Sequence, residues 1–289
     1  CGKGIPAALI MTLLRSVFRI EARFQTSAKQ LLCAVNDSMQ SNLDDRSFVT
    51  AICLVINPDG TPGYTWNPIV GCLHNCFYCY GKRIAKRFGD DYMPKYHPDR
   101  YLEAEKLKKP STIFVGSMGD MFGNWVNPEQ FNNIAFPKRH IYLFLTKNPS
   151  GYKRISLSPT NNNWRGITID SVNNNIGTMS YNDINNREKA GEFYRYVKDN
   201  KIKSFVSLEP LLKFDLENYN FDDAINELFD ITDWIIIGAL TINGKPQKTV
   251  NFKRVIDELK PYHHKMFVKD SVYKLYPELP QLRAIPYNE

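Results

Sequence analysis

Residues 63–81 read GYTWNPIVGCLHNCFYCYG and place three local patterns in a row. The strand-like run TWNPIVG comes first, a loop with three cysteines follows, and the helical pattern FYCYGKRIAKRF overlaps the end of that loop. A strand that leads through a loop into a helix is the repeating unit of α/β folds. The stretch therefore predicts an α/β fold, provided that further strand and helix patterns follow it.

Six more apolar runs follow along the chain, and helical patterns separate them. The runs are TIFVGSM (112–118), IYLFLTK (141–147), RGITID (165–170), SFVSLEP (204–210), WIIIGAL (234–240) and KMFVKD (265–270). The helical patterns cover residues 99–109, 186–200, 221–231 and 251–262. Strands that are apolar throughout and alternate with helices indicate a parallel sheet with helices on its faces. Seven such units fit a TIM-like (β/α) barrel, complete or incomplete, better than a doubly wound sheet.

Polar side chains stand at the carboxyl ends of six of these runs. They are Asp120, Thr146, Lys147, Asp170, Glu209, Thr241, Lys269 and Asp270. The active sites of barrel enzymes are built at this edge of the sheet. Any one of these residues could instead begin a turn or cap a helix. Their repetition in register favours a functional site at this edge.

The first 60 residues have a different character. Helical spacing of apolar residues predicts helices over residues 9–20 and 27–43, and FVTAICLVINPDG (48–60) reads as a buried strand that ends in a turn. The pattern changes at the turn-forming sequence GTPGY. We therefore expect a short α+β fragment over residues 1–60 and a barrel domain over residues 61–289.

The N-terminal fragment resembles the serine phosphatases of the protein phosphatase 2C class that act in bacterial stress and sporulation signalling. The matching segments are GKGIPAALIM, the tripeptide VND and FVTAICLVINPDG. In that family an aspartate just upstream of the Gly-Lys-Gly turn binds a catalytic metal, and this chain begins after that position. The resemblance therefore implies a truncated fragment without phosphatase activity.

Composition restricts where the protein acts and what it binds. Its 43% hydrophobic residues suffice for a core, and no run approaches the roughly 20 uncharged apolar residues that a membrane span needs. We therefore expect a cytoplasmic protein with no membrane partner. The formal net charge of +7 is spread along the chain, so it permits a polyanionic partner such as nucleic acid without requiring one.

Half of the six cysteines, Cys72, Cys76 and Cys79, fall within eight residues. Clustered cysteines in a reducing compartment are more often metal ligands or redox groups than disulfides. A structural zinc site takes four ligands, and although His74 lies between the cysteines, a second separated pair is missing. Three thiolates on one loop can instead hold three irons of a 4Fe-4S cluster and leave the fourth iron open.

At this point the sequence resembles the radical S-adenosylmethionine superfamily, whose signature Cys72, Cys76, Tyr78 and Cys79 match. The wider run GYTWNPIVGCLHNCFYCY, with VGSMGDMF, FLTKNP, SLEPLL and FVKD, resembles its uncharacterised phage and bacterial branch. The resemblance implies a 4Fe-4S cluster on the three cysteines and S-adenosylmethionine as second cofactor. It also implies an external electron donor of the flavodoxin or ferredoxin type. Reductive cleavage would give methionine and a 5'-deoxyadenosyl radical that abstracts hydrogen from a substrate.

The resemblance further implies which residues contact S-adenosylmethionine. The expected cofactor-binding residues are Tyr78 and Gly238 at adenine, Ser117 and Asp120 at the amino group, and Thr168, Asp170 and Glu209 at the ribose and carboxylate. The segment GSMGD replaces the commoner Gly-Gly-Glu of relatives. Lys147, Glu209 and Lys269 are the candidate catalytic residues, and the two lysines could instead be exposed caps.

The substrate cannot be read from the sequence. Nucleic acid is one candidate, because nucleic-acid-repairing lyases belong to the same superfamily and the chain is basic. The alternative function is that of a non-catalytic protein that binds zinc through its cysteines, or that binds nucleic acid.

Overall fold

The computed structural model describes residues 12–14, 16–18, 20–21, 28–40, 63–155, 157, 162–173, 180–215 and 224–285. The chain divides into two compact units, Cys1–Gly63 and Tyr64–Glu289. The strand predicted over residues 48–60 lies outside the described residues. The assignment of residues 1–60 and 61–289 to separate domains stays a prediction.

The first unit contains helix α2 (Ala28–Gln40) and helical residues between positions 12 and 21. Leu14, Val35 and Met39 are buried together, and other apolar side chains of the preceding helical segment pack on them. The hydroxyl of Ser38 donates a hydrogen bond to the Glu21 carboxylate (3.2 Å). Val35 and Met39 belong to the apolar face predicted for the second helix, whereas Ile20, from the spacing that predicted the first, is 56% exposed.

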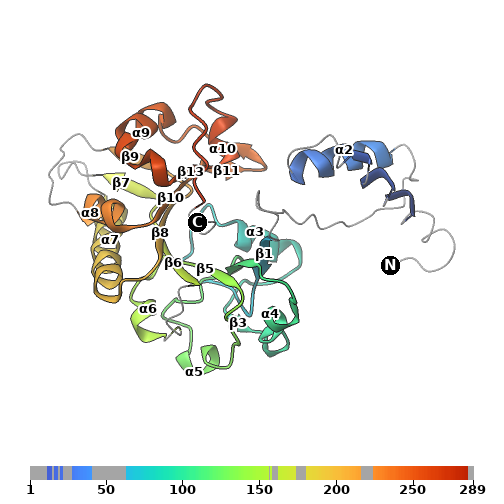
Figure 1. The fold of residues 1–289 in the computed structure, drawn as a ribbon, viewed down its shortest axis with the longest axis horizontal. Coiled ribbons are helices and arrows are strands. Elements are labelled where there is room, and N and C mark those ends of the chain that lie inside the picture. The colour runs from blue at the N-terminus through green and yellow to red at the C-terminus, as the bar shows by residue number, and fades with distance from the viewer. Residues whose placement is uncertain are drawn as a thin grey trace. The chain divides into compact units, whose positions relative to one another are not determined.

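The second unit is built on one curled sheet of seven strands in the order β1-β4-β5-β6-β8-β10-β13 (Figure 1). The strands are β1 (Gly63–Trp66), β4 (Thr112–Val115), β5 (Ile141–Thr146), β6 (Asn163–Thr168), β8 (Ser204–Leu208), β10 (Trp234–Ile237) and β13 (Met266–Val268). Neighbouring strands from β4 to β13 run parallel. The sheet is a half-barrel with β1 and β13 at its edges, so the TIM-like fold is confirmed in its incomplete form.

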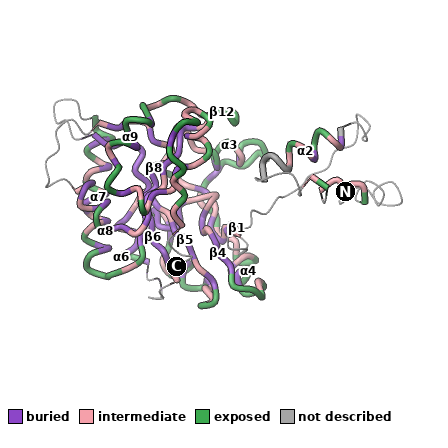
Figure 2. Tube along the Cα trace, turned by 45° about the horizontal axis from the view of Figure 1, so that its top comes forward, coloured by how far each residue is buried: buried purple, intermediate pink, exposed green. Residues whose placement is uncertain are grey.

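Helices cover the outer face of this sheet (Figures 1 and 2). They are α4 (Glu103–Lys106), α5 (Pro128–Phe131), α6 (Gly151–Arg154), α7 (Tyr181–Asn200), α8 (Ala224–Ile231), α9 (Phe252–Glu258) and α10 (Asp270–Tyr273), with 3-10 turns at Pro98–Arg100 and Lys260–Lys265. Helix α3 (Tyr80–Arg87) follows the cysteine loop, and none of its residues belongs to the core under these helices. The longest, α7, begins with a capping box between Ser180 and Asp183. Over the described residues, no helix has the length and apolar character needed to cross a membrane.

Three two-stranded sheets accompany the seven-stranded sheet. They pair β2 (Ile69–Val70) with β3 (Lys95–Tyr96), β7 (Ser171–Asn173) with β9 (Lys213–Asp215), and β11 (Thr241–Ile242) with β12 (Lys245–Pro246). The run TWNPIVG was predicted as one strand, and this was wrong, because β1 ends at Trp66 and β2 begins at Ile69. Pro68 has no N–H to donate to a neighbouring strand. The Asn67 side chain accepts from the Met118 N–H instead (2.7 Å), so the chain leaves the main sheet here.

Side chains alternate between the two faces of the sheet, as the period of a strand requires. On β5, Tyr142 and Phe144 belong to the main core under the helices, whereas Leu143 and Leu145 belong to a second apolar cluster. We call the second cluster the concave floor; its members are Phe114, Ile141, Leu143, Leu145, Trp164, Phe205, Trp234, Ile236 and Phe267. The two clusters lie on opposite faces, so the inner face of the half-barrel is apolar.

Replacing Phe144 by alanine tests the packing of the main core. Phe144 is fully buried and contacts the rings of Phe122, Phe136 and Tyr142. We expect Phe144→Ala to lower the free energy of unfolding by about 3–5 kcal/mol, because the cavity left behind cannot be refilled. Urea unfolding followed by circular dichroism measures the change. The matched control Phe88→Ala, at a side chain that is 84% exposed, should change it by less than about 0.5 kcal/mol.

Candidate functional site

The cysteine loop is fixed where it leaves β2. Gly71 has φ 88°, a conformation that favours glycine, and a Cβ there would collide with the carbonyl oxygen of Met93. Its N–H donates to the Met118 carbonyl (2.9 Å), and the Cys72 N–H donates to the Tyr92 carbonyl (3.2 Å). The first cysteine is therefore held between two other segments of the backbone.

The last cysteine begins helix α3. Cys79 is the N-cap residue, and its Sγ accepts from the Lys82 N–H (3.4 Å). For Cys72, burial raises the pKa to about 12, with smaller contributions from the negative charges of Asp120, Cys76 and Cys79. The Cys72 thiol therefore needs a cationic partner, such as a metal, to ionise at neutral pH.

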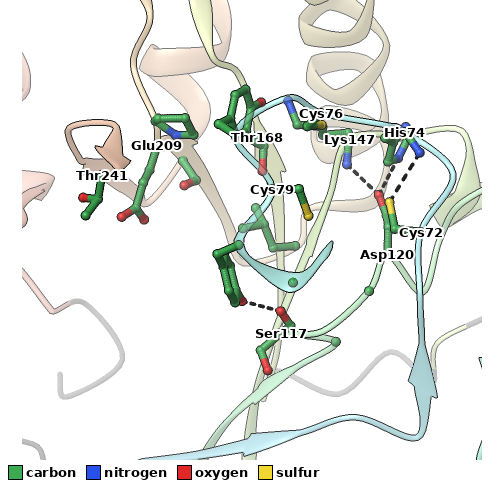
Figure 3. Close-up of a pocket in the computed structure, with 18 of the residues that line it drawn as sticks. Cys72, His74, Cys76, Cys79, Ser117, Asp120, Lys147, Thr168, Glu209 and Thr241 are labelled. Atoms are coloured by element: carbon green, nitrogen blue, oxygen red, sulfur yellow. Dashed lines mark hydrogen bonds and ion pairs between the residues drawn. The ribbon is translucent and has the colours of Figure 1, made fainter. Parts of the chain in front are cut away.

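A cavity of about 840 Å³ lies between the cysteine loop and the concave floor (Figure 3). The predicted site residues that line it are Cys72, Cys76, Tyr78, Cys79, Ser117, Asp120, Lys147, Thr168, Glu209 and Lys269. Asp170 and Gly238 lie outside its lining and act on residues within it, as described below. A volume of this size is typical of a site for a small-molecule cofactor. The structure thus brings together residues that the sequence spreads over almost 200 positions.

Asp120 is the most heavily bonded group of the cavity wall (Figure 3). It is 6% exposed, and its carboxylate accepts from His74 Nε2 (2.8 Å), Thr146 Oγ1 (2.8 Å) and the backbone N–H groups of Phe122 and Lys147 (both 2.9 Å). Burial alone would raise the pKa of Asp120, but these hydrogen bonds, His74 first among them, hold it below its ordinary value. The carboxylate therefore ties the cysteine loop to the end of β5.

A second network holds the aromatic residue of the cysteine motif. The Tyr78 hydroxyl donates to Asp170 Oδ2, and Lys147 Nζ forms an ion pair with the same oxygen (2.8 Å). Asn182 (3.1 Å) and Asn186 (2.9 Å), both on α7, donate to Asp170 Oδ1. Asp170 thus orients Tyr78 and Lys147 from behind the cavity wall.

Glu209 and Lys269 form an ion pair on the opposite wall. Their side chains are 32% and 42% exposed, so both are open to the cavity. The Glu209 side chain lies over Gly238, where a Cβ would come within 2.7 Å of Glu209 Cγ. Gly238 therefore gives the glutamate the space that a larger residue would fill.

The cysteines fit an iron-sulfur cluster. All three are free thiols and line the same cavity. A cluster takes thiolates on different irons, so its ligands surround it and do not meet at one point. Among the residues that the structure describes, no three His, Cys, Asp or Glu side chains are arranged around a single ion. Three cysteine thiols that line one cavity are a donor set of the type that binds iron-sulfur clusters.

Sequence reasoning missed other parts of the wall. Tyr92 lines the cavity, and its hydroxyl lies 3.8 Å from Cys79 Sγ above Gly81. No local pattern marks it, because it comes from an irregular segment. Arg83 and Arg87 also line the cavity, and their spacing of four on the predicted helix could have placed them on one face.

The Asp170 network gives folding a pH dependence. Burial alone would raise the pKa of Asp170, but the charge and hydrogen bond of Lys147 outweigh it and lower that pKa. Its stabilising contribution is complete above about pH 4 and is lost as the pH falls further. We expect Asp170→Asn to lower the free energy of unfolding by about 3 kcal/mol at pH 7 and by less at pH 3. Urea unfolding at both pH values measures this; an equal loss at both would contradict the ion pair.

Family models match two parts of the chain. Residues 62–257 match the model described as protein of unknown function (DUF5131). Residues 1–67 match the model of stage II sporulation protein E (SpoIIE), which agrees with the sporulation-type resemblance predicted for this part. A search of curated proteins gives no match.

Solved structures of spore photoproduct lyase show a distant likeness. A double mutant of this lyase with bound AdoMet and dinucleoside spore photoproduct has a TM-score of 0.41 at 15% identity, over 68% of this chain and 60% of the lyase chain. The lyase complexed with dinucleoside spore photoproduct has a TM-score of 0.38 at 16% identity, over 67% and 59%. The chain thus spans about 60% of the length of these lyases. The match of residues 62–257 covers more than half of the chain, which therefore belongs to the family described as protein of unknown function (DUF5131).

Proposed function

We propose that residues 61–289 form a radical S-adenosylmethionine enzyme. One observation carries the proposal: the three motif cysteines and the polar groups at the carboxyl ends of the strands line a single cavity. A cluster loop alone would suit electron transfer, and polar strand ends alone would suit many barrel enzymes. Their meeting in one space of about 840 Å³ suits a second cofactor bound beside the cluster.

Each wall of the cavity has a separate task in this proposal. When bound, the cluster and S-adenosylmethionine supply reductive cleavage of the sulfonium and a 5'-deoxyadenosyl radical. Cys72, Cys76 and Cys79 hold the cluster. Glu209 and Lys269 bind the charged amino acid end of S-adenosylmethionine, and the apolar concave floor excludes water from the reaction.

The remaining site residues orient these groups. Asp120 acts as a positioning residue, because its oxygens already accept hydrogen bonds from His74, Thr146 and two backbone groups. Asp170 positions Tyr78 at the adenine and Lys147 at an anionic group of the substrate or cofactor. Ser117, Thr168 and the Gly238 backbone complete the cofactor contacts.

The proposed function also implies an electron donor, a cellular compartment and a substrate class. An external flavodoxin-type or ferredoxin-type protein supplies the electron, and the free thiols suit the cytoplasm. The motifs outside the cysteine loop support the phage and bacterial branch of the superfamily. We propose nucleic acid as the substrate class. Residues 1–60 form a separate phosphatase-like domain, in keeping with the two compact units.

Removing one motif cysteine tests the cluster. We expect Cys72→Ala, Cys76→Ala or Cys79→Ala to abolish iron and sulfide retention after anaerobic reconstitution, because three thiolates are the minimum that holds the cluster. Iron and sulfide analysis with visible absorbance measures this. The matched control Cys33→Ala, at an exposed cysteine of α2, should keep full iron content.

Two results would contradict this reading. Full iron and sulfide content in a variant in which all three motif cysteines are replaced would show that the cluster lies elsewhere. Stoichiometric zinc without sulfide in the anaerobically purified protein would support the zinc-binding alternative instead.

Glu209→Gln tests the cofactor site. It removes a charge without touching a thiolate, so we expect S-adenosylmethionine affinity to fall about tenfold or more while iron content stays unchanged. Calorimetry measures the affinity, and chromatography of 5'-deoxyadenosine after dithionite reduction measures cleavage. The exposed Glu129→Gln on α5 is the matched control and should bind normally. No 5'-deoxyadenosine from wild-type protein with a complete cluster would end the radical mechanism.

A further inference from the structure

A second cavity, of about 500 Å³, lies at the amino-terminal edge of the main sheet. Asn163 begins β6 there, while Lys203 and Asp233 directly precede β8 and β10. The cysteine cavity is lined by residues at the other edge, such as Thr146 and Thr168 at the ends of β5 and β6. The two cavities therefore belong to opposite ends of the half-barrel.

Arg165 is the unexplained group of this second cavity. It lines the cavity, yet it is 4% exposed, and among the residues that the structure describes its Nε has no hydrogen-bond partner. Its guanidinium lies over the ring of Tyr196 (5.8 Å), and no carboxylate among the described residues forms an ion pair with it. A buried charge without a counter-ion is strongly unfavourable. Arg165 is therefore the candidate anion-binding group of this cavity.

The rim of the cavity adds positive charge. Lys198, Lys201 and Lys203 line it, and Asp233 supplies the single carboxylate of the lining. That carboxylate already accepts from the Ser204 N–H (2.8 Å) and lies 4.0 Å from Lys203. Lys198 contacts the Tyr194 hydroxyl (3.1 Å). Cationic groups thus outnumber the acid that faces them.

Lys201, one of the three lysines of the rim, stands where the chain leaves α7. Lys201 ends α7 with φ 49° and ψ 49°, a left-handed conformation that glycine or asparagine adopts more readily. A lysine at the carboxyl end of a helix also interacts favourably with the helix dipole. That effect accounts for a lysine near this end of α7.

We propose that this cavity binds a phosphate group carried by a small organic molecule or by a nucleic-acid end. A planar guanidinium donates paired hydrogen bonds to phosphate oxygens, and ammonium groups add charge. The cavity is larger than a phosphate ion, and Val197, Ile202 and Ile231 give it apolar walls for the attached body. The proposal is independent of the chemistry in the cysteine cavity.

Calorimetry with the full chain at constant ionic strength tests this site. The probes are inorganic phosphate, ribose 5-phosphate against ribose, and a single-stranded oligonucleotide with or without a 5'-phosphate. We expect binding only with a phosphate group, and about tenfold or greater loss of affinity in Arg165→Met. Tighter binding of ribose 5-phosphate indicates a small-molecule ligand, whereas tighter binding of the 5'-phosphorylated oligonucleotide indicates nucleic-acid ends.

Three further variants separate a loss of phosphate binding from a loss of folding. Lys201→Asn suits the left-handed cap and should fold at least as stably, yet bind phosphate about threefold more weakly. Lys253→Ala, an exposed lysine on α9, is the matched control and should bind like wild type. The triple cysteine variant should also bind normally. Equal binding by wild type, Arg165→Met and Lys201→Asn, or equal binding of ribose and its phosphate, would overturn the proposal.

Discussion

The hydrogen bonds to the Asp120 carboxylate are the constraint on which the cysteine cavity depends. His74 lies between two cysteines of the motif, and its ring reaches Asp120 at 2.8 Å, while Thr146 and the Lys147 backbone approach from the end of β5. A buried carboxylate needs several such donors. The loop that carries the cysteines is therefore fixed against the sheet by a group that forms no part of the cysteine motif.

The apolar inner face of the half-barrel complements this polar anchor. Period-2 alternation sends one set of β-strand side chains into the helix-covered core and the other set onto the concave floor. A floor of Phe114, Phe205, Trp234 and their neighbours lowers the local dielectric, which strengthens each charged contact above it. The ion pairs of Lys147 with Asp170 and of Lys269 with Glu209 stand at this boundary. The cavity thus combines an apolar base with charged walls.

The parts of the molecule that the sequence predicts are those set by local pattern. Alternating strands and helices predicted a TIM-like barrel, complete or incomplete, and the strand ends predicted Lys147, Glu209 and Lys269 at one edge of the sheet, where they line one cavity. The break at Asn67 and Pro68 was missed because apolar residues, Trp66 and Ile69, stand directly on both sides of it. Tyr92 was missed because only tertiary contact brings it to Cys79. Long-range packing determines such contacts, and no periodicity in the chain records it.

The difference between local pattern and long-range packing also explains why the environment of Arg165 could not be predicted from the sequence. In the sequence it stands in an apolar run that was assigned to a strand, where its charge has no evident reason. Alternation then decides its environment, because Trp164 faces the concave floor and Arg165 must face the helices. Packing under α7 removes its hydration without providing a carboxylate. An anion that bound Arg165 in the folded protein alone would stabilise the half-barrel, because a ligand that binds only the folded state shifts the folding equilibrium.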